Sequence, residues 1–200
     1  MRDLRGILEA VRAIARASQR DAAAPVVFAE VCRVVCEGFG FDRSSVARYH
    51  EAARELEMVA LYGDDSGGVP ARLPLEAAPM MAQALESGEL LYIADVRSTA
   101  AIPADVVESY GVTSIFVVPL ISGGECIGFL SADRRGSPFA LDELEVDTLE
   151  TVAVIAATLL EKVMLAEESR RLAGLKDQFI SLASHELRTP LAAAYGAIET

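Results

Sequence analysis

Residues 112–132, VTSIFVVPLISGGECIGFLSA, decide the fold of this chain. Residues 112–121 are apolar and rich in β-branched side chains, Gly123-Gly124 can form a tight turn, and residues 125–132 return as a second apolar run. Two such runs around a pair of glycines predict an antiparallel β-hairpin. This hairpin is the pair of strands that the sequence specifies best.

The segments around the hairpin predict further strands and helices. Short apolar runs predict strands at residues 44–49, 56–62 and 90–94. Apolar residues spaced by three and four predict helices at residues 4–14, 25–37, 75–85 and 103–109, and from residue 141 towards the end. This mixed order favours an α+β fold, with an antiparallel sheet flanked by helices and followed by a long C-terminal coiled-coil helix.

Three motifs follow one another in and after the hairpin: VPL at 118–120, IGFLSAD at 127–133, and PF at 138–139 leading into LDEL at 141–144. Together they resemble a GAF domain that extends over about residues 25–165. The resemblance implies a pocket for a small molecule between the sheet and the short helices around residues 75–110. We expect an N-terminal amphipathic helix (1–20), a GAF-like sensor domain (21–165), a helical linker (166–175) and a last segment (176–200).

Several polar or aromatic residues near the expected pocket are candidates for ligand contacts. They are Tyr62, Tyr92, Asp95, Tyr110, Phe116 and Asp133. A tyrosine at such a position can also be a core residue whose hydroxyl reaches outward. The ligand itself stays open, because the chain has no bilin signature and lacks the asparagine-lysine-phenylalanine signature of cyclic-nucleotide-binding GAF domains.

Histidine and cysteine side chains offer two alternative chemistries. His50 is a candidate haem ligand, although a solvent-facing position at the end of a strand is favoured. Cys32 and Cys36, four residues apart on one helix face, could serve a redox enzyme like the GAF relatives that reduce free methionine sulfoxide. Their valine neighbours favour inert buried thiols instead. The cysteines are too scattered to predict a metal site.

The last segment contains SHELRTPL at residues 184–191, preceded by KDQF at 176–179. These residues resemble the phosphoacceptor box at the start of the HisKA-type dimerisation domain of sensor histidine kinases. A neutral imidazole is nucleophilic near pH 7, so His185 can attack phosphorus. The resemblance makes His185 the phosphoacceptor, Glu186 its general base and Thr189 the position used when phosphohistidine is hydrolysed.

A kinase also needs ATP and Mg²⁺, and the resemblance places their site in a separate domain beyond this chain. No GxxxxGK[ST] run is present to bind nucleotide phosphates. We therefore expect the front part of a kinase, or a natural truncation. In the intact protein the phosphoryl group would pass from His185 to the receiver domain of a response regulator.

Composition excludes several other classes of protein. The net charge of −12 comes from 30 acidic and 18 basic residues, which disfavours nucleic-acid binding. Residues 151–160 form the longest strongly apolar run, far below the roughly 20 residues of a membrane span. The N-terminus does not resemble a signal peptide, and few cysteines suit a reducing compartment, so a cytoplasmic protein is expected.

The C-terminal helix carries two apolar sets with the alternating spacing of a coiled-coil seam. They are Leu149, Val152, Ala156, Leu159 and Val163, then Leu172, Leu175, Phe179 and Leu182. Nine residues separate Val163 from Leu172, which predicts a local change of winding. Such a seam predicts a homodimer.

These observations favour the sensory input and phosphoacceptor segment of a cytoplasmic two-component histidine kinase. Signals would pass along the C-terminal helix to His185. The alternative is a stand-alone dimeric GAF module that binds a small molecule and has no kinase activity.

Overall fold

The computed structural model describes residues 24–63, 71–99, 102, 107–108, 111–136 and 138–198, with side chains up to Ile180. The expected helix at 1–20, most of the expected helix at 103–109, and Tyr110 lie outside the described residues. The backbone of His185, Glu186 and Thr189 is described, whereas their side chains are not. Among the described residues, no helix is long and apolar enough to cross a membrane.

The described elements are six strands, three α-helices and three short 3-10 turns. The strands are β1 Arg43–His50, β2 Glu55–Gly63, β3 Arg72–Pro74, β4 Leu91–Ile93, β5 Ser114–Ser122 and β6 Glu125–Arg134. The α-helices are α2 Ala24–Phe39, α3 Pro79–Ser87 and α5 Glu143–Ile198. Short 3-10 turns are η1 Glu51–Ala53, η2 Leu75–Ala77 and η3 Val96–Ser98.

The strands form one antiparallel sheet in the order β3-β2-β1-β6-β5-β4. The α+β fold predicted from the sequence is therefore confirmed. The hairpin β5–β6 is also confirmed, and its turn has positive φ angles at Gly123 (59°) and Gly124 (87°). Two successive positive φ angles match the type I′ turn that suits the twist of a hairpin. The hairpin places β6 beside β1 at the centre of the sheet.

One expected helix starts later than predicted. Residues 75–85 were expected to be continuous, but Leu75–Ala77 form the turn η2 and α3 begins at Pro79. Proline lacks a backbone N–H and disfavours helical geometry in the preceding residue, so it suits the first helical position. Gly88 ends α3 with a left-handed φ of 70°.

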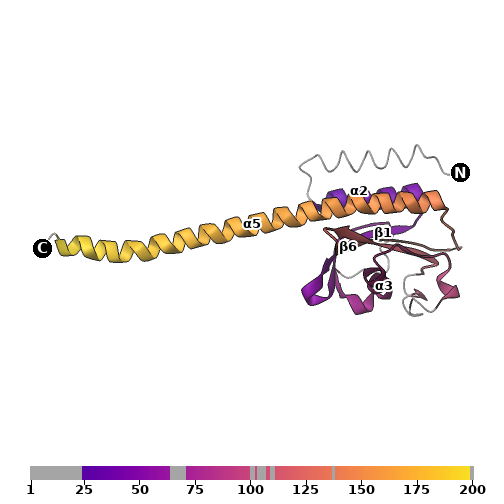
Figure 1. Ribbon diagram of the computed structural model, residues 1–200, viewed down its shortest axis with the longest axis horizontal. Helices are drawn as coiled ribbons and strands as arrows, with labels where there is room; N and C mark the ends of the chain where they lie inside the picture. Colours follow the sequence, from indigo (N-terminus) through magenta and orange to yellow (C-terminus); the bar gives the residue numbers. More distant parts are fainter. Residues whose placement is uncertain are drawn as a thin grey trace. The chain divides into compact units, whose positions relative to one another are not determined.

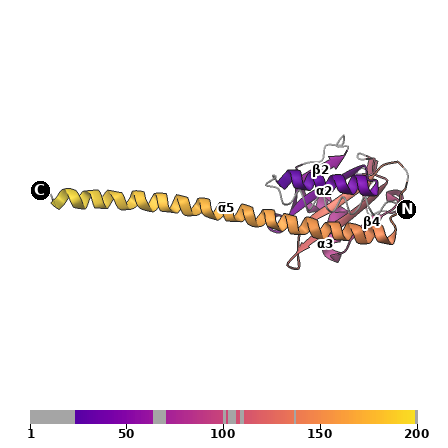
Figure 2. The same cartoon turned by 90° about the horizontal axis from the view of Figure 1, so that it is seen from above.

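Helix α2 and the first part of α5 cover one face of the sheet, here called the helix face (Figure 1, Figure 2). Leu149, Val152, Ala156 and Leu160 of α5 are buried. A Cβ atom added at Gly128 would lie 2.8 Å from Leu160 Cδ2 and 2.4 Å from the carbonyl oxygen of Ala47. The absence of a side chain at Gly128 therefore allows α5 to approach strand β6 closely.

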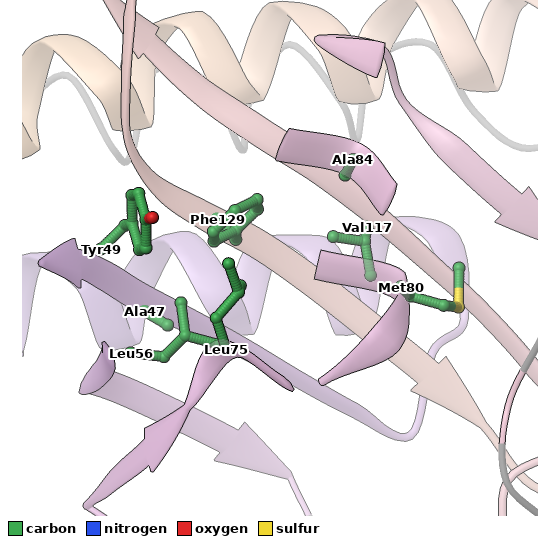
Figure 3. Close-up of a cluster of buried hydrophobic side chains, with 8 residues drawn as sticks. All are labelled: Ala47, Tyr49, Leu56, Leu75, Met80, Ala84, Val117 and Phe129. Carbon is green, nitrogen blue, oxygen red and sulfur yellow. The ribbon is translucent and has the colours of Figure 1, made fainter. Parts of the chain in front are cut away.

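Helix α3 and turn η2 lie against the opposite face, here called the cavity face. A buried cluster connects them to the sheet, and Figure 3 shows its members: Ala47, Tyr49, Leu56, Leu75, Met80, Ala84, Val117 and Phe129. The rings of Tyr49 and Phe129 meet edge to face, with centroids 6.2 Å apart. This cluster fixes one end of α3 against the two central strands.

Helix α5 belongs to two compact units, Met1–Glu161 and Lys162–Thr200. In the first unit, Leu149, Val152 and Ala156 are buried within the chain itself. The prediction that these residues form a coiled-coil seam is therefore wrong, because the domain's own core already covers them. In the second unit, Leu172, Leu175 and Phe179 are exposed. The buried residues of the first set and the exposed residues of the second set thus have different environments.

Candidate functional site

A cavity of about 330 Å³ lies on the cavity face, between the sheet and the segment that leads into α3. Its walls are mostly apolar. They are formed by Met58, Leu61, Leu73, Ala77, Ala78, Pro79, Met80, Met81, Ile102, Val112, Ile115 and Val117, together with the polar residues Arg43, Ser45, Ser131 and Asp133. This volume is at the lower end of the range for small-molecule sites.

The polar wall residues form two neighbouring cross-strand pairs on β1 and β6. Arg43 lies opposite Asp133, and Ser45 lies opposite Ser131. Arg43 Nε donates a hydrogen bond of 2.8 Å to Asp133 Oδ2, and Arg43 Nη2 lies 2.7 Å from the same oxygen. The hydroxyl groups of Ser45 and Ser131 are 2.8 Å apart and share a hydrogen bond. We call these four residues the polar row.

The ion pair in the polar row is largely removed from solvent. Arg43 is 6% exposed and Asp133 is 7% exposed. Burial raises the pKa of the Asp133 carboxyl above its ordinary value, and the nearby Arg43 charge opposes that rise. Within the described part of the chain, Asp133 Oδ1 is buried and has no hydrogen-bond partner. A buried acceptor without a partner is costly, so this oxygen favours a ligand that donates a hydrogen bond.

The residues predicted to contact a ligand are divided between the two faces of the sheet. Asp133 is part of the cavity wall. Phe116 is fully buried against Phe41, with ring centroids 5.1 Å apart, whereas its neighbours Ile115 and Val117 line the cavity. Successive side chains of a strand point to opposite faces, which explains why Phe116 is outside the wall.

The other described candidates also lie away from the cavity wall. The hydroxyl of Tyr62 donates to Glu37 of α2, so it faces the helix side. The hydroxyl of Tyr92 donates to the carbonyl oxygen of Phe139, in the segment before α5. The carboxylate of Asp95 accepts from the backbone N–H of Arg97 and caps turn η3. Each of these side chains has a structural partner in the domain.

Arg43, Ser45, Ser131 and the three methionines of the cavity wall were not among the residues predicted from the sequence. Arg43 and Ser45 share a face by the two-residue period of a strand, as do Ser131 and Asp133. Polar residues repeated every second position on two apolar strands were the available signal. Their pairing in register between β1 and β6 could be seen only in the structure.

The cysteine and histidine alternatives are weakened by their surroundings. Cys32 is 0% exposed and Cys36 is 6% exposed, and burial raises the pKa of each thiol to about 12. Neither thiol is part of the cavity wall, and all three cysteines are free. His50 Nε2 lies 2.6 Å from Glu57 Oε2, also away from the wall. Among the described residues, no group of three or more His, Cys, Asp or Glu side chains could hold a metal ion.

Comparison with known families identifies residues 25–160 as a GAF domain. The chain belongs to the GAF domain family. No HisKA domain is detected in the chain. A search of curated proteins finds no match.

Solved structures of GAF domains share the fold. Free methionine-R-sulfoxide reductase from Neisseria meningitidis is 24% identical, with 80% of this chain and 91% of that chain covered and a TM-score of 0.66. The GAF domain of a phosphoenolpyruvate-protein phosphotransferase from Coxiella burnetii is 19% identical, with 84% of this chain and 98% of that chain covered and a TM-score of 0.68. Residues 122–287 of a methyl-accepting chemotaxis protein are 22% identical, with 76% of this chain and 98% of that chain covered and a TM-score of 0.63. At these identities the similarity establishes the fold alone.

Proposed function

We propose that this chain is the sensory input and phosphoacceptor segment of a two-component histidine kinase. The observation that carries the proposal is the combination of a GAF domain with SHELRTPL at residues 184–191 on one helix, α5. The GAF domain would bind a small molecule in the cavity. The helix would connect that event to His185, which accepts the phosphoryl group.

Strand β6 offers a physical route from the cavity to α5. Ser131 and Asp133 of this strand line the cavity, whereas Gly128 of the same strand approaches Leu160 of α5. A ligand that moves β6 relative to the other central strand must therefore also move, or repack, the contact with Leu160. Protein interiors are close-packed, so a small shift at one face of a strand is transmitted to the other.

The exposed residues of the second unit support a homodimer. Leu165, Leu172, Leu175 and Phe179 are exposed and follow one another at intervals of seven, three and four residues. These intervals match a coiled-coil seam. A second copy of α5 is the proposed partner, because it would present the same seam and bury both sets of side chains. A Leu172→Glu/Phe179→Glu variant should be monomeric in sedimentation equilibrium, whereas Glu167→Gln should leave the dimer intact.

The chemistry at residue 185 would follow from its imidazole. In the proposed reaction a ring nitrogen of His185 attacks the γ-phosphorus of ATP, the P–O bond to ADP breaks, and Glu186 takes up the ring proton. A separate domain would supply ATP and Mg²⁺, which position the phosphoryl group and stabilise its charge. The phosphoryl group would then pass to a receiver-domain aspartate of a response regulator. Thr189 would serve the separate hydrolysis of phosphohistidine, in which water takes up the phosphoryl group and inorganic phosphate is released.

The test mixes the full chain with an isolated histidine-kinase ATP domain and radiolabelled ATP. Acid-labile, base-stable label is expected on the wild type and should be lost in His185→Ala. Glu186→Gln should slow labelling by about 100-fold or more, in the range of general-base effects. Equal labelling of wild type and His185→Ala would overturn the proposal.

A second candidate function is a stand-alone GAF module that binds a small molecule. The finding that favours it is the detection of a GAF domain without a HisKA domain. This module would bind ligand in the same cavity but would not be labelled at His185 under the conditions above.

Similarity to a free methionine-R-sulfoxide reductase also suggests redox chemistry. The positions of Cys32 and Cys36 argue against it. A nucleophilic cysteine requires an accessible thiolate, whereas these thiols are buried with pKa values of about 12.

A further inference from the structure

The walls of the cavity determine which kind of molecule would fit there. This inference rests on the proposed sensory role of the cavity. Most of the wall is apolar, and three of its side chains are Met58, Met80 and Met81. Methionine is flexible and polarisable, so it adapts to apolar groups of different shapes. The body of the ligand should therefore be apolar.

Charge is disfavoured on the ligand because the polar row already carries a matched pair. The positive charge of Arg43 and the negative charge of Asp133 are held together at 2.7 Å. A buried ion would have to compete with the hydrogen bonds that already hold this pair together, which is unfavourable. A neutral molecule avoids this cost.

Apart from the Arg43 guanidinium, the polar row offers one acceptor and one hydroxyl donor. Asp133 Oδ1 is the buried acceptor without a hydrogen-bond partner among the described residues. Ser45 and Ser131 have one hydroxyl proton each, and the hydrogen bond between them uses only one of the two. The second proton remains to donate to a ligand. A ligand with both an N–H or O–H group and a carbonyl would use both.

We propose that the cavity binds an uncharged, mostly apolar molecule that carries one hydrogen-bond donor and one acceptor, of which a carboxamide is the simplest example. Its N–H group donates to Asp133 Oδ1, and its carbonyl oxygen accepts from the serine pair. The small volume of about 330 Å³ favours a ligand with one or two rings over a tetrapyrrole.

The experiment compares four probes of nearly the same shape with the full chain: naphthalene-2-carboxamide, 2-acetonaphthone, 2-naphthoate and naphthalene-2-carboxamidinium. Binding is measured by fluorescence of the naphthalene ring and by calorimetry. The carboxamide should bind about tenfold more tightly than each of the others. The ketone lacks a donor, and the remaining two probes carry a charge.

Two double variants test the two ends of the polar row. Arg43→Met/Asp133→Leu removes the acceptor together with its charged partner. In this variant the dissociation constants of the ketone and the carboxamide should be about equal. Ser45→Ala/Ser131→Ala removes the donor and should weaken carboxamide and ketone alike, by about threefold to tenfold. Met81→Trp narrows the cavity and should weaken all four probes.

The outcomes separate the ligand class from the proposed sensory role. Equal or tighter binding of naphthoate or carboxamidinium overturns the ligand class but leaves a ligand-binding cavity. If Met81→Trp leaves the affinity of the probes unchanged, the probes bind outside the cavity and the inference is overturned. Absence of binding by all four probes overturns it too, whereas the phosphoacceptor role is decided independently by labelling at His185.

Discussion

The two faces of the sheet are built differently, although both are covered by helices. On the helix face, α2 and α5 pack directly on the strands, and the side chains there include the fully buried Phe28, Phe116 and Leu149. On the cavity face, α3 leaves a hollow of about 330 Å³ above a polar row. The comparison teaches that the packed helix face provides most of the stability of the fold. The cavity face is packed less completely, and the resulting space can hold a ligand.

The largest loss of stability is expected when a large buried side chain is removed from the helix face. Phe28 is fully buried, so Phe28→Ala should lower the free energy of unfolding by about 3–5 kcal/mol, through lost burial and the cavity left behind. Leu73 is only partly buried in the cavity wall, so Leu73→Ala should cost about 1 kcal/mol. Urea denaturation of both variants measures this contrast. Equal losses would show that the two faces contribute alike.

The buried ion pair predicts a similar loss on the cavity face, but only when one partner is removed. Asp133→Leu removes the carboxylate that the buried Arg43 contacts through Nε and Nη2, and it should destabilise the fold by about 3–5 kcal/mol. The double variant Arg43→Met/Asp133→Leu should recover most of that loss. Chemical denaturation of the two variants in parallel gives the comparison. A double variant as unstable as the single one would contradict this view of the pair.

A smaller loss of stability is expected from adding a side chain at Gly128, where the strands and helix α5 come close together. A Cβ atom at Gly128 would meet the Ala47 carbonyl oxygen at 2.4 Å, so Gly128→Ala should cost about 1–3 kcal/mol. Gly174 of α5 is the matched control, because a Cβ atom there meets nothing within 4 Å. Gly174→Ala should leave stability unchanged or raise it by about 0.5–1 kcal/mol. Thermal unfolding followed by circular dichroism measures both.

The smallest effect concerns the thiols of the helix face. Burial raises the pKa of Cys32 and Cys36 to about 12, so each stays protonated in the folded state up to that pH. Alkylation by iodoacetamide between pH 7 and 9 should therefore be much slower at both than at a free thiol with a pKa near 8.5. Denatured protein is the control and should react at the ordinary rate. Mass spectrometry showing rapid modification of either cysteine in the folded protein would contradict this prediction.

The sequence predicted the elements of the fold better than the faces of its strands. The Gly123-Gly124 turn identified the hairpin, because few other sequences allow two positive φ angles. Phe116 and Val117, however, are both apolar and buried, although they point to opposite sides. A strand covered on both faces lacks a polar side, so its pattern could not show which residues line the cavity.

The same limit applies to helix α5. Leu149 and Leu172 both fit a coiled-coil spacing, but Leu149 is buried within the domain and Leu172 is exposed. Spacing identifies an apolar stripe without saying what covers it. Among the candidate ligand residues, Asp133 lies in the cavity wall. Its partner Arg43 could not be found from sequence, because the two residues are 90 positions apart and meet only through the pairing of β1 with β6.

The most direct test of the central claim uses the methionines as reporters. Met58, Met80 and Met81 line the cavity, whereas Met164 lies on α5, four residues after the buried Leu160. Methyl NMR is recorded on protein labelled with ¹³C-methionine during titration with naphthalene-2-carboxamide. The signals of all three cavity methionines should shift. The Met164 signal should shift as well if ligand binding changes helix α5. Unchanged signals of Met58, Met80 and Met81 at saturating probe would contradict the assignment of the cavity face as the ligand-binding face.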